Sequence, residues 1–248
     1  MPNLGLVRLR TERCAHGSVV KEQYSQSPLQ AHRPLYLERG APPVVFLKTP
    51  SSGLLEGDEH RIDISVGEGS ALTLATQAST LAYPGSSRQT LTAHIHCGGF
   101  LKFHPHMLIL GAESALRQRT VIHLEPGASL DYQEEWCAGR IAMGECWRFS
   151  TFDYAIEILQ SDKLVYRERW LLDTSKQDLI NPVICGRFTH FKTRFLFGTA
   201  IEDSHSPSPA CKSDYERQWT LKKESGRIMR SASRPVALSL RALDGNLV

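Results

Sequence analysis

With 248 residues, 41% of them apolar and 22% charged, the chain can bury a sizeable core. Its net charge of +3 and its lack of a dense Lys/Arg run argue against a nucleic-acid partner, and no apolar stretch approaches the roughly 18 residues that span a bilayer. Charges interrupt the N-terminal run MPNLGLVRLRTER where a signal peptide needs an apolar core, so we expect one cytoplasmic domain, residues 1–248.

The first segments of the chain predict β-strands. Gly5–Arg10 alternates apolar and charged residues, and Ser18–Tyr24 is expected to pair with it across a turn at His16–Gly17. Val44–Lys48 is a short apolar strand. The chain therefore begins as β structure, before any repeat is visible.

The segment Ser51–Glu145 repeats with a period of 29 residues. Each unit reads as an alternating strand, a glycine-containing turn and a second alternating strand. Equivalent residues follow the period in three sets: Gly69, Gly98 and Gly127; Leu72, Leu101 and Leu130; Val66, Ile95 and Leu124. A fixed period in this range is typical of stacked supersecondary units. The sequence thus predicts an all-β, layered, β-helix-like scaffold with few short helices.

The remaining segments continue this pattern. Cys137–Glu145 is a glycine-framed loop, and Trp147–Leu159 with Leu164–Leu172 reads as a β-hairpin. Arg187–Phe197 is a phenylalanine-rich strand. Only Asp214–Lys223 is a candidate helix.

Neither the cysteines nor the short motifs indicate catalysis. No CxxC pair, zinc-finger spacing, HExxH, Gly-x-Ser-x-Gly elbow or phosphate-binding loop occurs, so we expect no enzyme. Scattered thiols favour a reduced intracellular chain. The six cysteines are Cys14, Cys97, Cys137, Cys146, Cys185 and Cys211.

Two groups of polar residues are candidates for metal binding. His94 and His96 share one side of a strand and can chelate one ion, although a buried histidine beside an exposed one is the alternative. Gln77, His106 and Glu135 stand one period apart and form a column if stacked in register. The alternative for that column is a solvated ladder on an outer face.

Two glycine-rich spots carry acidic residues. Gly57–Asp58 precedes a strand, where an aspartate usually bonds to the backbone of its own turn. Gly139–Arg140 and Gly144–Glu145 frame the loop after the repeats. Arg140 and Glu145 can pair within that loop, or Glu145 can face the interior and attract cations.

Taken in order, these motifs resemble one family, the urease accessory proteins of the D type, called H type in some organisms. The resemblance is carried by Gly57–Asp58, Thr76–Gln77, Arg117–Gln118, Gly139–Arg140 and Gly144–Glu145, and it covers about Val44–Leu172. Its specificity lies in the order and separation of the motifs.

The resemblance implies a non-enzymatic, mainly β scaffold that helps deliver nickel to the urease apoprotein. Its implied partners are that apoprotein, a helical accessory protein of the F type and a GTPase of the G type. It implies an internal tunnel, transient Ni²⁺ and no permanently bound cofactor. On that reading Asp58, Glu135 and Glu145 lie on the nickel route, with His106 as a local addition. The motif residues Gly57, Thr76, Gln77, Gly139, Arg140 and Gly144 are structural.

The chain departs from the family pattern in places. Lys102 stands where relatives often carry an acidic residue, and the chain stops at ALDGNLV where relatives usually continue into a helical segment, so we expect a shortened form. Two other functions stay open. One is a metal-dependent enzyme that uses His94, His96 and His106, and the other is a structural β-solenoid without a metal role.

Overall fold

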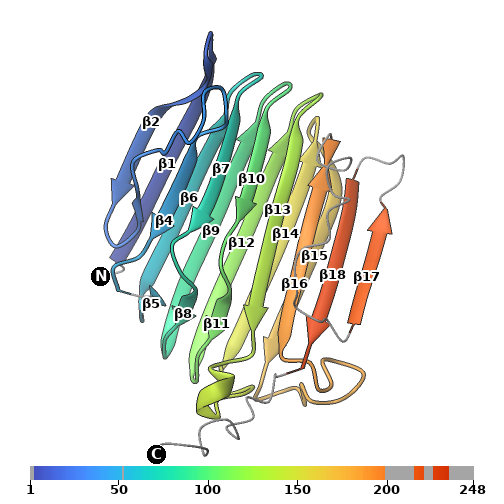
Figure 1. Cartoon of the computed structure of the whole chain (residues 1–248). Helices are drawn as coiled ribbons and strands as arrows, with labels where there is room; N and C mark the ends of the chain where they lie inside the picture. The colour runs from blue at the N-terminus through green and yellow to red at the C-terminus, as the bar shows by residue number, and fades with distance from the viewer. Residues whose placement is uncertain (1–2, 52, 199–214, 221–225, 235–248) are drawn as a thin grey trace, which may run out of the picture.

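The computed structural model describes residues 3–51, 53–198, 215–220 and 226–234, and the regular secondary structure of these ranges is almost wholly β-strand (Figure 1). The strands are β1 (Asn3–Cys14), β2 (Gly17–Gln26), β3 (Gln30–Ala31), β4 (Val44–Lys48), β5 (Gly53–Leu54), β6 (Asp58–Val66), β7 (Ala71–Thr76), β8 (Thr80–Ala82), β9 (Gly85–Ile95), β10 (Phe100–His104), β11 (Leu108–Leu110), β12 (Ser114–Leu124), β13 (Ser129–Cys137), β14 (Thr151–Gln160), β15 (Lys163–Asp173), β16 (His190–Phe197), β17 (Tyr215–Thr220) and β18 (Gly226–Ser233). The one helical element in these ranges is the 3₁₀ turn η1 (Ile141–Met143). The all-β prediction is confirmed.

Two sheets pack face to face around a shared core. The first has seven strands in the order β15-β14-β12-β9-β6-β1-β2. The second follows β17-β18-β16-β13-β10-β7-β4-β3, with the short strands β5, β8 and β11 attached beside it. One hydrophobic cluster joins the inner faces, with Ile62 and Ile122 from the first sheet and Leu72 and Leu101 from the second. Figure 1 shows the strands arranged across the molecule from β2 and β1 at the left edge to β18 and β17 at the right edge.

The 29-residue repeat forms successive turns of a coil. In the first sheet β6, β9 and β12 run parallel, and Ile95 lies opposite both Val66 and Leu124. In the second sheet β7, β10 and β13 run parallel, and Leu101 lies opposite both Leu72 and Leu130. Stacking the units lets each one bury the apolar faces that it cannot bury alone.

The turn glycines of the three units are equivalent. Their φ angles are 59°, 63° and 72° for Gly69, Gly98 and Gly127. This left-handed backbone is one that glycine adopts without the steric cost that a Cβ imposes. The predicted equivalence of these three turns is therefore confirmed.

The period shortens by one residue where the coil passes through its short strands. Leu108 of β11 lies opposite Thr80 of β8 and Trp136 of β13, each 28 residues away. Residues 105–107 leave the ladder between β10 and β11. A strict 29-residue column through His106 therefore does not form.

The C-terminal strands include corrections to the predicted boundaries. The hairpin is present as β14 and β15, but β14 begins at Thr151, and β16 begins at His190. The predicted helix Asp214–Lys223 is wrong in its described part, because Tyr215–Thr220 pairs antiparallel with β18. The ladder offered by β18 outweighs local helix propensity, which is a weak influence.

Two further observations concern the cysteines and the possible membrane spans of the described residues. The cysteines in these ranges, Cys14, Cys97, Cys137, Cys146 and Cys185, are all free thiols, and Cys211 lies outside the ranges. Searching the same ranges for a helix long and apolar enough to cross a membrane finds none.

Candidate functional site

A cavity of about 50 Å³ lies between the two sheets, which is room for a few water molecules. Strands β7, β9, β10, β12, β13 and β14 contribute to its wall. Its polar lining side chains are Thr76, Thr80, Gln89, His106, Gln118, Arg119, Thr120, Tyr132, Glu134, Glu135 and Tyr154. The centre of this β-sandwich is therefore not wholly apolar.

Part of this polarity comes from one register position of the first sheet. His60, Gln89, Gln118 and Tyr154 lie opposite one another on β6, β9, β12 and β14. His60 is buried, and no described residue hydrogen-bonds to its Nε2 atom. Burial lowers the pKa of His60, although Asp58 acts in the opposite direction. The row thus supplies neutral polar groups to the interior.

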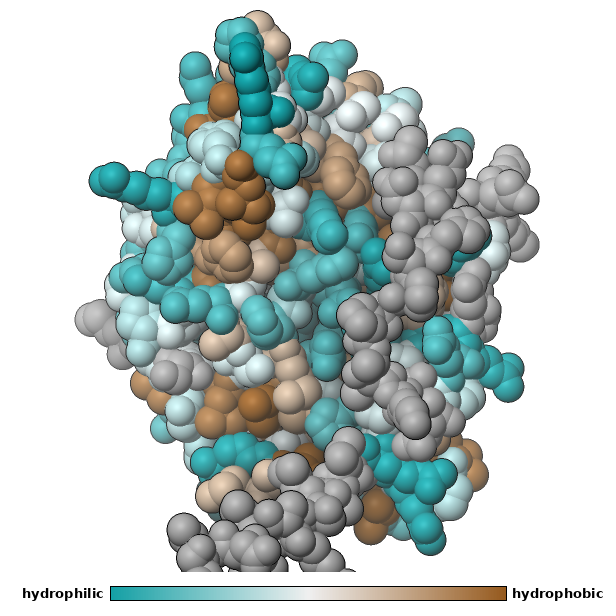
Figure 2. Space-filling model, viewed as in Figure 1, coloured by the Kyte–Doolittle hydropathy of each residue, from teal (hydrophilic) through white to brown (hydrophobic). Residues whose placement is uncertain are grey.

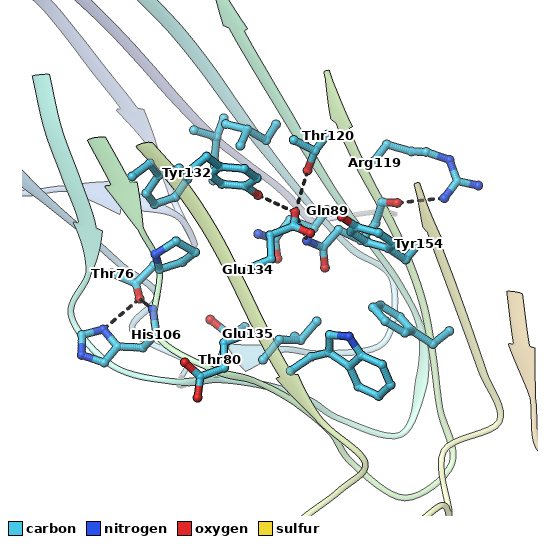
Figure 3. A pocket seen from close by; sticks show the side chains of 18 residues that line it. Thr76, Thr80, Gln89, His106, Arg119, Thr120, Tyr132, Glu134, Glu135 and Tyr154 are labelled. Carbon is cyan, nitrogen blue, oxygen red and sulfur yellow. Dashed lines mark hydrogen bonds between the residues drawn. The ribbon is translucent and has the colours of Figure 1, made fainter. Parts of the chain in front are cut away.

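Glu134 is the buried carboxyl group at the centre of the cavity (Figure 3). Its Oε1 atom accepts hydrogen bonds from the Tyr132 hydroxyl, from Thr120 Oγ1 at 3.2 Å and from Gln118 Nε2 at 3.4 Å. Burial raises the pKa of Glu134 to about 7, against the lowering effect of hydrogen bonds from Tyr132, Tyr154 and Thr120. A carboxyl group poised near neutrality can exchange a proton for a cation.

The predicted residue His106 lies at the exposed side of this cavity. Its Nδ1 atom is 3.2 Å from Thr76 Oγ1, and its backbone N–H donates to the same oxygen at 2.8 Å. Glu135 is half-buried and lines the cavity with them, whereas Gln77 is exposed and does not line it. The structure thus brings His106 and Glu135 to one cavity and leaves Gln77 outside.

Asp58 begins β6 at a different opening. It is buried, and its Oδ2 atom accepts a hydrogen bond from the Leu55 N–H at 2.9 Å, while Gly57 has a φ of 80°. The aspartate therefore serves its own turn. Asp58 also lines a cleft of about 520 Å³ where β6, β9, β12 and β14 begin, together with Arg88 and Arg117.

Arg140 and Glu145 pair within their loop. Arg140 Nε donates to Glu145 Oε2 at 2.8 Å and its Nη2 atom donates to Oε1, so the contact is bidentate. Gly139 and Gly144, with φ of 133° and 74°, allow the chain to turn around η1. Glu145 is not among the residues that line the cavity, and its part in a cation route stays a prediction.

The two candidate histidines His94 and His96 make different contacts, and their joint binding of a metal ion stays a prediction. His96 Nδ1 is 2.9 Å from Glu125 Oε1, while the ring of His94 stacks on that of His123. In the described part of the chain no group of three or more His, Cys, Asp or Glu side chains is arranged to hold a metal ion. His94, His96 and His106 therefore do not form a shared three-histidine site.

Comparison of the sequence with known proteins identifies one family. The family described as UreD urease accessory protein matches residues 4–244. The chain belongs to this family. The resemblance carried by the short motifs is thereby confirmed.

Curated members of the family are similar over different parts of the chain. A urease accessory protein UreD 2 of Synechococcus sp. (strain JA-3-3Ab) is 41% identical over 137 residues, which are 55% of this chain and 49% of that protein. A UreH of Helicobacter hepaticus is 28% identical over 79% of both chains, and a UreD of Sorangium cellulosum is 32% identical over 79% of this chain and 64% of its own. The matched region spans about half the length of two Synechococcus relatives, 49% and 57%.

Sequence reasoning missed the residues that make the interior of this family member polar. Glu134 was passed over in favour of Glu135, although it alternates with Leu130 and Tyr132, which are buried. His60 and Gln89 also lie at positions that alternate along their strands with buried apolar residues, so they face the core as well. A polar residue at a core-facing position of the 29-residue unit is the signal that would have found them.

The surface of the molecule also carries exposed apolar side chains. Leu35, Tyr36 and Leu37 are exposed between β3 and β4, and Figure 2 shows a hydrophobic area at the upper left of the same view. Val183, which is 91% exposed, lies with Ile180 in the segment between β15 and β16. Such areas are typical of surfaces that contact other proteins.

Proposed function

We propose that this chain acts in urease maturation as a non-catalytic scaffold, and that its interior passes nickel towards the urease apoprotein. Membership of the urease accessory family supports the first part. The observation that carries the second is Glu134, a buried carboxyl group in a polar cavity between the sheets. A stability-optimised core would carry an apolar residue there, because burying a polar group costs free energy.

The lining of the cavity offers ligands of different exposure. His106 is exposed, Glu135 is half-buried and Glu134 is buried, and all three line the cavity. Imidazole and carboxylate groups both bind Ni²⁺, and a path must release the ions that it takes up. Asp58 stands at the separate cleft, and we propose it as a further carboxylate on the route. Nickel is here a cargo, with no permanently bound cofactor.

The proposal includes partners. These are the urease apoprotein, a helical accessory protein of the F type and a GTPase of the G type, all in the cytoplasm. The exposed apolar side chains of Leu35, Leu37 and Val183 supply contact area for such partners. The free thiols of the described residues fit a reducing compartment.

Reconstitution tests the proposed function. Nickel-free urease is incubated with the F-type and G-type proteins at limiting nickel, with and without this chain, and urea hydrolysis is measured. We expect activation to depend on the chain, and the chain alone to hydrolyse no urea. Equal activation without the chain would contradict the proposal, and hydrolysis by the chain alone would show an enzyme instead.

A further inference from the structure

Two histidines from neighbouring parallel strands lie ring against ring on the outer face of the seven-stranded sheet. His94 of β9 is directly opposite His123 of β12. Their ring centroids are 4.4 Å apart and the ring planes differ by 7°. The next residue on each strand, Ile95 and Leu124, is buried in the core, so both imidazoles point away from it.

The ring nitrogens of this pair are not engaged. Within the described residues neither His94 nor His123 has a hydrogen-bond partner, whereas the ring of His96 is held by Glu125. Burial lowers the pKa of His94, and the neighbouring rings of His123 and His96 add to this effect. Asp63 and Glu125 act in the opposite direction, and the neutral ring that results is the form that binds metal ions. Stacked rings without hydrogen-bond partners keep their ring nitrogens available as metal ligands.

We propose that His94 and His123 together bind a divalent transition-metal ion, with one imidazole nitrogen each and water in the remaining positions. Imidazole suits Ni²⁺, Zn²⁺ and Cu²⁺, and Cu²⁺ binds most tightly in the usual order of affinities. With metal–nitrogen bonds of about 2.1 Å, adjacent ligand atoms must come within about 3 Å of each other. The rings therefore tilt towards each other from their 4.4 Å spacing, which the partly solvent-facing side chains allow.

This site is separate from the interior cavity. The cavity is lined by the inner face of the sheet, and neither His94 nor His123 belongs to its lining. The inference consequently does not depend on nickel passing through the interior. Loss of one function by mutation leaves the other to be measured on the same protein.

Nuclear magnetic resonance of the histidine rings during a Ni²⁺ titration tests the proposal, with the full chain free of any histidine tag. Paramagnetic Ni²⁺ should broaden the ring signals of His94 and His123 first and together. In His123→Gln the nickel concentration that half-broadens the His94 signal should rise about tenfold or more, because one of two protein ligands is lost. His16→Gln, a matched change at an exposed histidine in the β1–β2 turn, should leave the titration unchanged.

Two results would overturn the site. One is a His94 signal that broadens equally in the wild type and in His123→Gln. The other is broadening that begins at His16 or His32 instead of at the pair. Thermal unfolding of each variant checks that the substitution leaves the fold intact. The reciprocal variant His94→Gln should weaken the broadening of the His123 signal to a similar degree.

Discussion

Replacing Glu134 by Gln is expected to remove a stability loss that the wild type suffers as the pH rises from about 4.5 to 7. The Glu134 pKa is about 7 in the folded chain and 4.5 is the ordinary value. In that window the folded state holds a proton that the unfolded state has released, so raising the pH favours unfolding. This difference corresponds to about 3 kcal/mol, as an order of magnitude.

Chemical denaturation at several pH values measures the effect. The quantity to compare is the difference in free energy of unfolding, wild type minus Glu134→Gln. This difference should fall by about 3 kcal/mol between about pH 4.5 and pH 7 and then stay level. The control is Glu157→Gln, a partly exposed carboxylate 2.9 Å from Arg167 on the outer face, which should follow the wild type. Parallel pH profiles for the wild type and Glu134→Gln would show that Glu134 is not buried with a raised pKa.

Replacing Asp131 by Ala is expected to destabilise the chain by about 3 kcal/mol or more, because it leaves the Arg194 guanidinium without its carboxylate. Asp131 is buried and accepts two hydrogen bonds of 2.8 Å from Arg194, and its Oδ1 atom is 2.8 Å from His104 Nε2. Burial alone raises the pKa of Asp131, but its contacts with His104 and Arg194 hold it well below the usual range. Urea denaturation at neutral pH measures the loss.

An exposed ion pair provides the control for Asp131. Glu157→Ala removes the partner of Arg167, whose side chain is 62% exposed, and should cost at most about 1 kcal/mol. A loss of similar size for Asp131→Ala would mean that the Asp131–Arg194 contact contributes no more than a surface pair. Acidification should also weaken the wild type more than Asp131→Ala, because protonation removes the same contact.

The repeat made the coiled part of the fold predictable. Gly69, Gly98 and Gly127 recur at one interval, and a left-handed turn, two parallel ladders and the core positions all follow from it. The C-terminal strands were less predictable. Tyr215–Thr220 becomes a strand only because β18 lies beside it, and no local pattern reports a pairing between distant segments.

The candidate site was predictable only in outline. His106 and Glu135 do reach one cavity, but the column with Gln77 fails because the ladder loses a residue between β10 and β11. Glu134 was missed because counting one period of 29 residues from His106 leads to Glu135, the residue next to it. The pairing of His94 with His123 depends on the register of β9 against β12, which the same repeat could have supplied.

The nickel dependence of urease activation by Glu134→Gln tests the central claim most directly. At a pH above 7, where the wild-type carboxyl group is charged, the variant should need about tenfold more nickel for half-maximal activation and should match the wild type at excess nickel. Glu157→Gln should behave as the wild type at every concentration. Coinciding curves for the wild type and Glu134→Gln at limiting nickel would contradict passage of nickel through the interior.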